Sequence, residues 1–111
     1  MKTIRSLEAL DRVLARDRVL LYKHSTRCGL STRAQRQIRR FMENFPAAPV
    51  YLVDVIADRS VSDAIEARLG IRHETPQAIL VEDGDPLRDA SHRGVRADVL
   101  TAWWEREAGS R

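Results

Sequence analysis

Short apolar runs alternate along this chain with segments whose apolar residues recur every three or four positions. The runs at 19–22, 50–55 and 77–82 are continuous and brief, which is typical of strands buried on both faces of a sheet. Asp83-Gly84 follows the third run and signals a turn. We therefore expect a weaker fourth strand at 87–92, paired with the third as a hairpin.

Four other segments show the periodicity of amphipathic helices. The first follows Ser6, which we expect to cap it, and the second begins near Leu30 and ends before Pro46. The third covers 61–69 with Gly70 as its C-cap, and the last covers 96–107. The residues expected to face the core in the first three helices are Leu7, Leu10 and Leu14, then Leu30, Ala34, Ile38, Phe41 and Phe45, then Val61, Ala64, Ile65 and Leu69. In the last helix we expect Val99, Leu100, Trp103 and Trp104 to be partly buried, with one tryptophan covering the sheet.

The predicted order of elements is helix, strand, helix, strand, helix, strand, strand, helix. Two strand–helix–strand units imply parallel pairing with right-handed crossovers, and the final hairpin is antiparallel. The pattern thus predicts an α/β fold with a central mixed four-stranded sheet flanked by helices on both faces. A chain of 111 residues without a linker or repeat fits a single domain over 1–111.

Composition narrows the class of protein further. Hydrophobic residues make up 43% and charged residues 32%, as expected for a globular chain. The net charge is only +3, and arginines alternate with acidic residues along most of the chain. We therefore expect no nucleic-acid partner. No apolar stretch approaches the roughly 18 residues of a membrane span, and the first residues lack the features of a signal peptide. With one cysteine, no internal disulfide forms, and we expect a cytoplasmic protein.

The single cysteine lies in KHSTRCGLS, residues 23–31. Cys28 follows the first predicted strand and precedes a helix, where unpaired N–H groups and the helix dipole stabilise a thiolate. Arg27 is adjacent, and the Ser31 hydroxyl is placed to hydrogen-bond the sulfur. The alternative is a small buried apolar residue, which polar neighbours such as Thr26 disfavour. We interpret Cys28 as a nucleophile that needs a second molecule to resolve any disulfide it forms.

Other charged residues allow two interpretations. Arg33, Arg36 and Arg40 recur at helical spacing and form either a site for acidic groups or a solvated helix face, and we interpret Arg36 and Arg40 as the solvated face. The three histidines, His24, His73 and His92, match no zinc-binding spacing. We therefore expect no metal site.

Three stretches together resemble the YtxJ family, also called bacilliredoxin BrxC: KHSTRCGLS, HETPQAIL (73–80) and ASH (90–92). These are monothiol proteins of the thioredoxin-like fold that use bacillithiol. The resemblance implies that Cys28 attacks protein–bacillithiol mixed disulfides. It also implies that Pro76 is a cis-proline facing Cys28, and that the Thr75 backbone binds the substrate, with His24 and His73 beside it.

The resemblance carries further expectations about partners. Bacillithiolated proteins and a low-molecular-weight thiol would be the partners, with bacillithiol as co-substrate, no bound cofactor, and a monomeric state. Gly29 replaces the family's usual proline and Leu30 its isoleucine, and Gly29, Leu30 and Ser31 would shape the surroundings of the thiolate.

Two alternatives stay open. Residues 28–31, CGLS, differ by one residue from the CGFS motif of monothiol glutaredoxins that carry iron–sulfur clusters. Against that, DASHRGVRADVL lacks the Gly-Gly-x-Asp signature with which glutaredoxins hold glutathione. The second alternative is a thioredoxin-like module that binds partners without redox chemistry.

Overall fold

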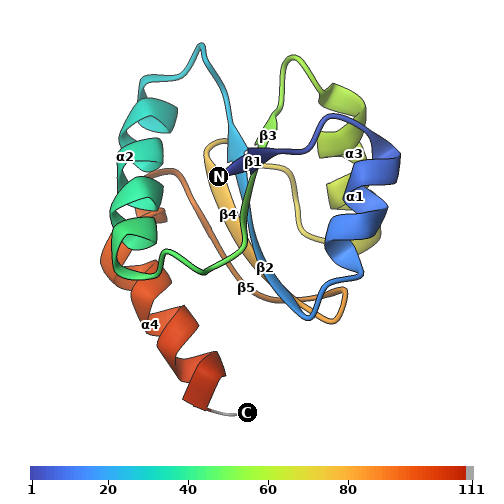
Figure 1. Ribbon diagram of the computed structural model, residues 1–111. Coiled ribbons are helices and arrows are strands. Elements are labelled where there is room, and N and C mark those ends of the chain that lie inside the picture. The colour runs from blue at the N-terminus through green and yellow to red at the C-terminus, as the bar shows by residue number, and fades with distance from the viewer. Residues whose placement is uncertain (110–111) are drawn as a thin grey trace.

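A five-stranded mixed sheet forms the centre of the computed structural model, which describes residues 1–109, with side chains through Arg106 (Figure 1). The strand order is β1-β3-β2-β4-β5. The strands are β1 (Lys2–Thr3), β2 (Arg18–His24), β3 (Val50–Asp54), β4 (Gln77–Glu82) and β5 (Asp85–Ser91). The predicted runs thus form β2, β3 and β4, and the expected α/β sheet with its final hairpin is present.

The prediction of four strands was wrong by one. β1 has only two residues, both exposed, and pairs in parallel with β3 through Lys2 opposite Tyr51 and Thr3 opposite Leu52. An exposed edge strand of this length has no apolar run, so nothing in the hydrophobic pattern marks it.

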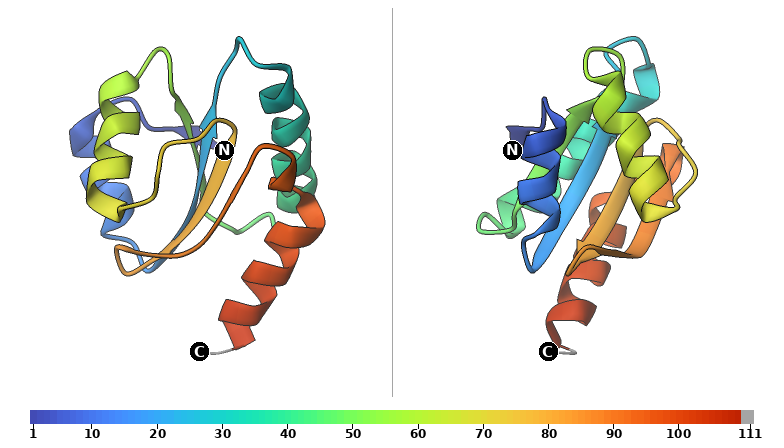
Figure 2. Two further views of the ribbon diagram at one scale, coloured as in Figure 1. Left: turned by 180° about the vertical axis from the view of Figure 1, so that it is seen from behind. Right: turned by 90° about the vertical axis from the view of Figure 1, so that its right-hand side faces the viewer.

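The direction of β4 also differs from the prediction. β2 and β3 are parallel, as the first strand–helix–strand unit implies, but β4 is antiparallel to β2. The reason is the segment 70–76 after α3 (Arg59–Leu69), which returns along the length of α3 before β4 begins (Figure 2). The chain therefore enters β4 at the edge where β2 ends, and the second unit contains no parallel crossover.

Helices cover both faces of the sheet. α1 (Leu7–Leu14) and α3 lie on one face, and α2 (Gly29–Asn44) and α4 (Ala97–Gly109) on the other (Figure 1). A 3-10 turn, η1 (His92–Gly94), precedes α4. Both predicted caps are present: Ser6 Oγ accepts the Ala9 N–H at 3.1 Å, and Gly70 ends α3 with a left-handed φ of 67°. Within the described residues, no helix combines the length and apolar character that crossing a membrane requires.

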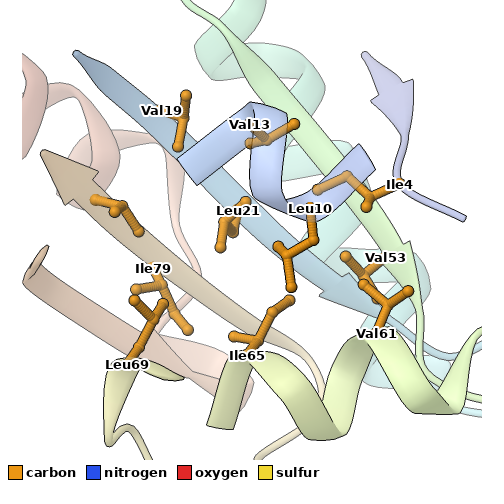
Figure 3. Close-up of a cluster of buried hydrophobic side chains, with 11 residues drawn as sticks. Ile4, Leu10, Val13, Val19, Leu21, Val53, Val61, Ile65, Leu69 and Ile79 are labelled. Atoms are coloured by element: carbon orange, nitrogen blue, oxygen red, sulfur yellow. The ribbon is translucent and has the colours of Figure 1, made fainter. Parts of the chain in front are cut away.

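Each face of the sheet has its own apolar core, because side chains alternate along β2. Leu21 packs with the α1 and α3 side chains, whereas Leu20 and Tyr22 pack beneath α2 and α4. Figure 3 shows Leu10 and Val13 of α1 directed toward this first core.

One detail of helix packing differs from expectation and another agrees with it. Leu7 is 44% exposed, and α1 buries Leu10 and Val13 instead of Leu7. Trp103 and Trp104 are both partly buried against the second core, and the Trp104 ring meets Phe41 edge to face. Both tryptophans therefore have a packing role.

A lysine is buried in the first core region. Lys23 on β2 is fully buried, and no described residue hydrogen-bonds its Nζ atom. Gln77, directly opposite on β4, is also buried, and its Oε1 atom has no partner in the described part of the chain. Burial lowers the pKa of Lys23 from 10.5 to about 8, because desolvation disfavours the ammonium.

We predict that Lys23→Met stabilises the protein at neutral pH. A pKa fall from 10.5 to about 8 corresponds to about 3 kcal/mol of destabilisation at 1.36 kcal/mol per unit. Below pH 8 the amine is charged in both the folded and unfolded states, so the whole cost applies. Between pH 8 and 10.5 the folded protein loses the proton first and its stability rises. Urea unfolding of both proteins between pH 8 and 10.5 should show that the stability gained by Lys23→Met disappears as the pH rises. An advantage that does not change with pH would contradict this account.

Candidate functional site

Cys28 is the N-cap residue of α2, as the sequence predicts. Its backbone is extended (φ −117°, ψ 122°), and its thiol is free and partly exposed. The loop from β2 is closed by the Cys28 N–H, which donates to the Ser25 carbonyl at 3.3 Å. The carbonyl of Cys28 accepts N–H groups from Ser31 and Thr32 at 3.1 and 3.4 Å. The sulfur is therefore held at the N-terminal turn of a 16-residue helix.

The first turn of α2 lowers the pKa of Cys28. The largest contribution is the backbone N–H of Ser31, and the Leu30 N–H and the Ser31 hydroxyl add to it. Desolvation acts in the opposite direction. Ser31 is buried, and its Oγ atom accepts the Ser25 N–H at 3.2 Å, which fixes the hydroxyl beside the thiol. These donors favour the thiolate, the nucleophilic form of cysteine.

The loop before β4 lies at the same edge of the sheet as Cys28. Lys23 pairs with Gln77, so the preceding Pro76 lies beside His24 at the end of β2. The Thr75–Pro76 peptide bond is cis, and the Pro76 carbonyl accepts the His92 N–H at 2.8 Å. The backbone N–H and C=O of Thr75 make no hydrogen bond within the described residues. They can therefore pair with an extended chain.

His73 supports this loop from the side of α3. Its Nδ1 atom lies 3.4 Å from Ser62 Oγ, and its Nε2 atom lies 3.3 Å from Thr75 Oγ1. Its backbone N–H donates to Glu66 Oε2 at 2.6 Å. Burial lowers the pKa of His73, so the ring is neutral at neutral pH. The structure thus makes His73 a positioning residue for Thr75.

A buried tyrosine, which sequence reasoning missed, connects His24 to α2. The Tyr22 hydroxyl donates to the Ser31 carbonyl at 2.8 Å and lies 2.8 Å from His24 Nδ1. A phenol has one proton, and the carbonyl can only accept, so His24 Nδ1 must be the donor. This leaves Nε2 of His24 as an acceptor. Burial lowers the pKa of His24, which keeps the ring neutral.

Asp54 is a second residue that the sequence analysis did not single out. It lies opposite His24 in the β2–β3 register. Its Oδ1 atom accepts the N–H groups of Ile56 and Ala57, both at 2.9 Å, and the Ala57 N–H is the main reason that the pKa of Asp54 is lowered.

The sequence did contain a signal that could have pointed to Tyr22. It lies in a predicted buried strand, and a buried phenol needs a hydrogen-bond partner.

The structure brings most of the predicted site residues to one edge of the sheet. Cys28, Ser31, His24, Thr75 and Pro76 cluster where β2 ends and β4 begins. Arg27 and Gly29 are exposed and Leu30 is partly exposed beside the thiol, while His73 lies behind Thr75. Within the described residues, no group of three or more metal-ligating side chains comes together.

We predict that Tyr22→Phe costs about 1–3 kcal/mol of stability, because it leaves the buried Nδ1–H of His24 without an acceptor. Tyr51→Phe is the matched control and should cost little, because among the described residues the Tyr51 hydroxyl bonds only Arg16, at an exposed site. Nitrogen NMR of His24 in the unmodified protein should show the proton on Nδ1. A proton on Nε2, or equal losses in the two variants, would contradict the assignment.

Gly29→Pro should stabilise the protein by about 0.4–1 kcal/mol. Gly29 is the first residue of α2, the preferred place for proline, and a Cβ there meets nothing within 4 Å. Cys28 already has the extended backbone that precedes proline. Gly70→Pro is the control that should destabilise, because its φ is 67° and its N–H donates to Glu66. Thermal unfolding compares the two, and a loss of stability on Gly29→Pro would refute the expected fit.

Comparison with known proteins agrees with this geometry. The family model of the monothiol bacilliredoxin BrxC matches residues 1–100. A solved protein with a thioredoxin fold is 24% identical, with a TM-score of 0.86 over 91% of this chain and 90% of its own. Thioredoxin from Fasciola hepatica is 14% identical, with a TM-score of 0.77 over 96% of this chain and 98% of its own. Mitochondrial thioredoxin 3 from Saccharomyces cerevisiae is 15% identical, with a TM-score of 0.77 over 96% and 94%.

These structural likenesses show the thioredoxin fold, and the family match covers every element that positions Cys28. The chain is a thiol–disulfide oxidoreductase that belongs to the family of monothiol bacilliredoxins, BrxC.

Proposed function

We propose that this protein removes bacillithiol from oxidised proteins, with Cys28 as the nucleophile. The observation that carries the proposal is the partly exposed sulfur at the N-terminus of α2, whose pKa is lowered by the N–H groups of Ser31 and Leu30. A thiolate at neutral pH is what attack on a disulfide requires. The match to the bacilliredoxin family model supports bacillithiol as the small thiol.

The proposed reaction is a single exchange of thiols. The Cys28 thiolate attacks the bacillithiol sulfur of a protein–bacillithiol disulfide. A new sulfur–sulfur bond forms between Cys28 and bacillithiol, the old bond breaks, and the protein leaves as a thiolate that takes a proton from water. No electrons are gained or lost overall, because one disulfide replaces another.

Regeneration of the enzyme needs an external thiol. The chain has one cysteine, so no internal thiol can displace the bacillithiol from Cys28. A low-molecular-weight thiol, or the thiol of another protein, must attack the mixed disulfide and leave with bacillithiol bound to it. This dependence fits a reducing compartment such as the cytoplasm, and we expect the protein to act there as a monomer.

The Thr75–Pro76 loop would align the substrate with Cys28. The backbone N–H and C=O of Thr75 are available for pairing with an extended segment that carries the disulfide. His24 Nε2, kept as an acceptor by the Tyr22 hydrogen bond, is suited to receive a proton from an incoming thiol. His73 holds Thr75 in place. Arg27, the exposed residue before Cys28, is available to a carboxylate of the bound thiol.

We predict that bacillithiol moves from a modified protein substrate to this chain when the two are mixed. Intact mass spectrometry should show the bacillithiol mass leaving the substrate and appearing on Cys28, and Cys28→Ser should acquire none. The same substrates modified with glutathione instead of bacillithiol test which small thiol the protein recognises. Equal transfer from both substrates would contradict bacillithiol specificity, and no transfer from either would contradict the proposed activity.

The sequence 28–31 keeps a second candidate in view, an iron–sulfur carrier of the CGFS type. It would require Cys28 to ligate a cluster rather than attack a disulfide. Anaerobic reconstitution with iron, sulfide and a small thiol distinguishes the two. A coloured dimer that depends on Cys28 would favour the carrier, whereas a colourless protein that still accepts bacillithiol would favour the exchange enzyme.

A further inference from the structure

An arginine-lined groove runs between α2 and the start of α4. It has a volume of about 700 Å³, and four arginines line it together with a single carboxylate. The four are Arg33, Arg40, Arg93 and Arg96, and the carboxylate is that of Asp98. α4 lies against α2 on this side of the sheet (Figure 1), so the groove follows the helix that carries the thiol.

Most of this positive charge is not neutralised within the protein. Asp98 pairs with Arg96 at 2.9 Å, whereas Arg33, Arg40 and Arg93 have no carboxylate partner among the described side chains. Four arginines elsewhere in the fold have acidic partners, whereas others, such as Arg36 and Arg39, have none among the described side chains. Those pairs are Arg18–Glu82, Arg59–Asp63, Arg68–Asp11 and Arg72–Glu74. The groove therefore concentrates cations that can bind an external anion.

The base of the groove is held in place by a hydrogen bond between the two helices. Gln37 lies between Arg33 and Arg40 on this face of α2, and its Oε1 atom accepts the N–H of Ala97, the first residue of α4, at 2.9 Å. The guanidinium groups thus project from two elements that are already joined, and little ordering of the backbone is needed for a ligand to bind.

One end of the groove lies near the start of the helix that carries Cys28. Arg33 is five residues beyond Cys28 on α2, which is about 7.5 Å along the helix axis at 1.5 Å per residue. Arg93 lies in η1, next to His92, whose N–H donates to the Pro76 carbonyl. A ligand in the groove therefore lies beside the substrate-binding loop, without covering it.

The length of the groove indicates an extended peptide. From Arg33 to Arg40 is about 10 Å along the axis, so Arg40 is about 18 Å beyond Cys28. An extended chain advances about 3.3 Å per residue. Acidic residues two to five positions from a cysteine bound at Cys28 would therefore reach from Arg33 to Arg40. A single small anion would occupy only part of this distance.

We propose that this groove binds an acidic segment of the protein substrate, next to the cysteine whose disulfide Cys28 attacks. The inference rests on the proposed function and adds a feature of the substrate, a run of Asp and Glu two to five residues from the modified cysteine. Exposed charges of this kind accelerate encounter more than they strengthen the final complex, so we expect the preference mainly in the second-order rate constant.

The test uses synthetic peptides that carry bacillithiol on one cysteine, with four Glu, four Gln or four Lys at positions two to five on either side. All peptides carry the same small thiol, so the charges of bacillithiol affect every transfer rate equally. Mass spectrometry follows the transfer of bacillithiol from each peptide to Cys28. At low salt this transfer should be about tenfold faster for the Glu peptides than for the Gln peptides, on at least one side of the modified cysteine. High salt should reduce the difference.

Two groove variants and a matched control test the location. Arg40→Glu and Arg93→Glu should each reduce the preference for Glu over Gln severalfold, and the double variant should favour the Lys peptide. Arg39→Glu makes the same charge change on the other flank of α2, where Arg39 lines a different hollow, and should keep the preference. A preference that survives the double variant would overturn the inference.

Failure of the inference can be distinguished from failure of the proposed function. Equal transfer from Glu and Gln peptides at low salt would overturn the groove and leave the exchange reaction standing. If no peptide transfers bacillithiol, fluorescence anisotropy of a cysteine-free Glu peptide with the Cys28→Ser protein decides on the groove alone. Binding that Arg40→Glu weakens would support the groove, and no binding would overturn it.

Discussion

The contact between the Cys28 sulfur and the first turn of α2 is the interaction on which the chemistry of this protein depends. The backbone N–H groups of Ser31 and Leu30 lower the pKa of the thiol. Much of the surrounding structure fixes that turn in place. Ser31 is buried and bonded to the Ser25 N–H, and its carbonyl accepts the Tyr22 hydroxyl. Helix and strand are thus joined directly behind the sulfur.

The same strand supports both sides of the site, because its side chains alternate between the two faces of the sheet. Tyr22 and His24 face α2 and hold the turn that carries Cys28. Lys23 faces α3 and lies opposite Gln77 at the start of β4. Burying Lys23 without a hydrogen-bond partner among the described residues costs stability, and this cost arises directly beneath the loop that precedes β4. Local instability of this kind is common near functional sites.

The sequence predicted the parts of the fold that buried, periodic segments determine. The runs that form β2 and β4, the cap at Ser6 and the helix beginning after Cys28 all appear as expected. The resemblance in three short motifs indicated the family that the match over residues 1–100 then showed. The hydrophobic pattern could not reveal β1, whose two exposed residues carry no apolar signal. Hydrophobic pattern also could not fix the direction of β4, which depends on the path of residues 70–76.

Within the site, the sequence placed Cys28 at the start of a helix, as the structure does, but did not reveal the network behind it. Tyr22 appears in the sequence as the last residue of an apolar run, and only the fold brings its hydroxyl to His24 and Ser31. From the sequence, Arg36 and Arg40 of α2 are interpreted as a solvated face, because only the fold brings Arg33 and Arg40 together with Arg93 of η1.

The most direct test of the central claim is a pH titration of the Cys28 thiolate by its ultraviolet absorbance, in the unmodified protein and in Ser31→Ala. The account predicts a midpoint below that of a free cysteine, and a higher midpoint once the Ser31 hydroxyl is removed. A midpoint at or above that of free cysteine would show that the first turn of α2 does not activate the thiol, and would contradict the account.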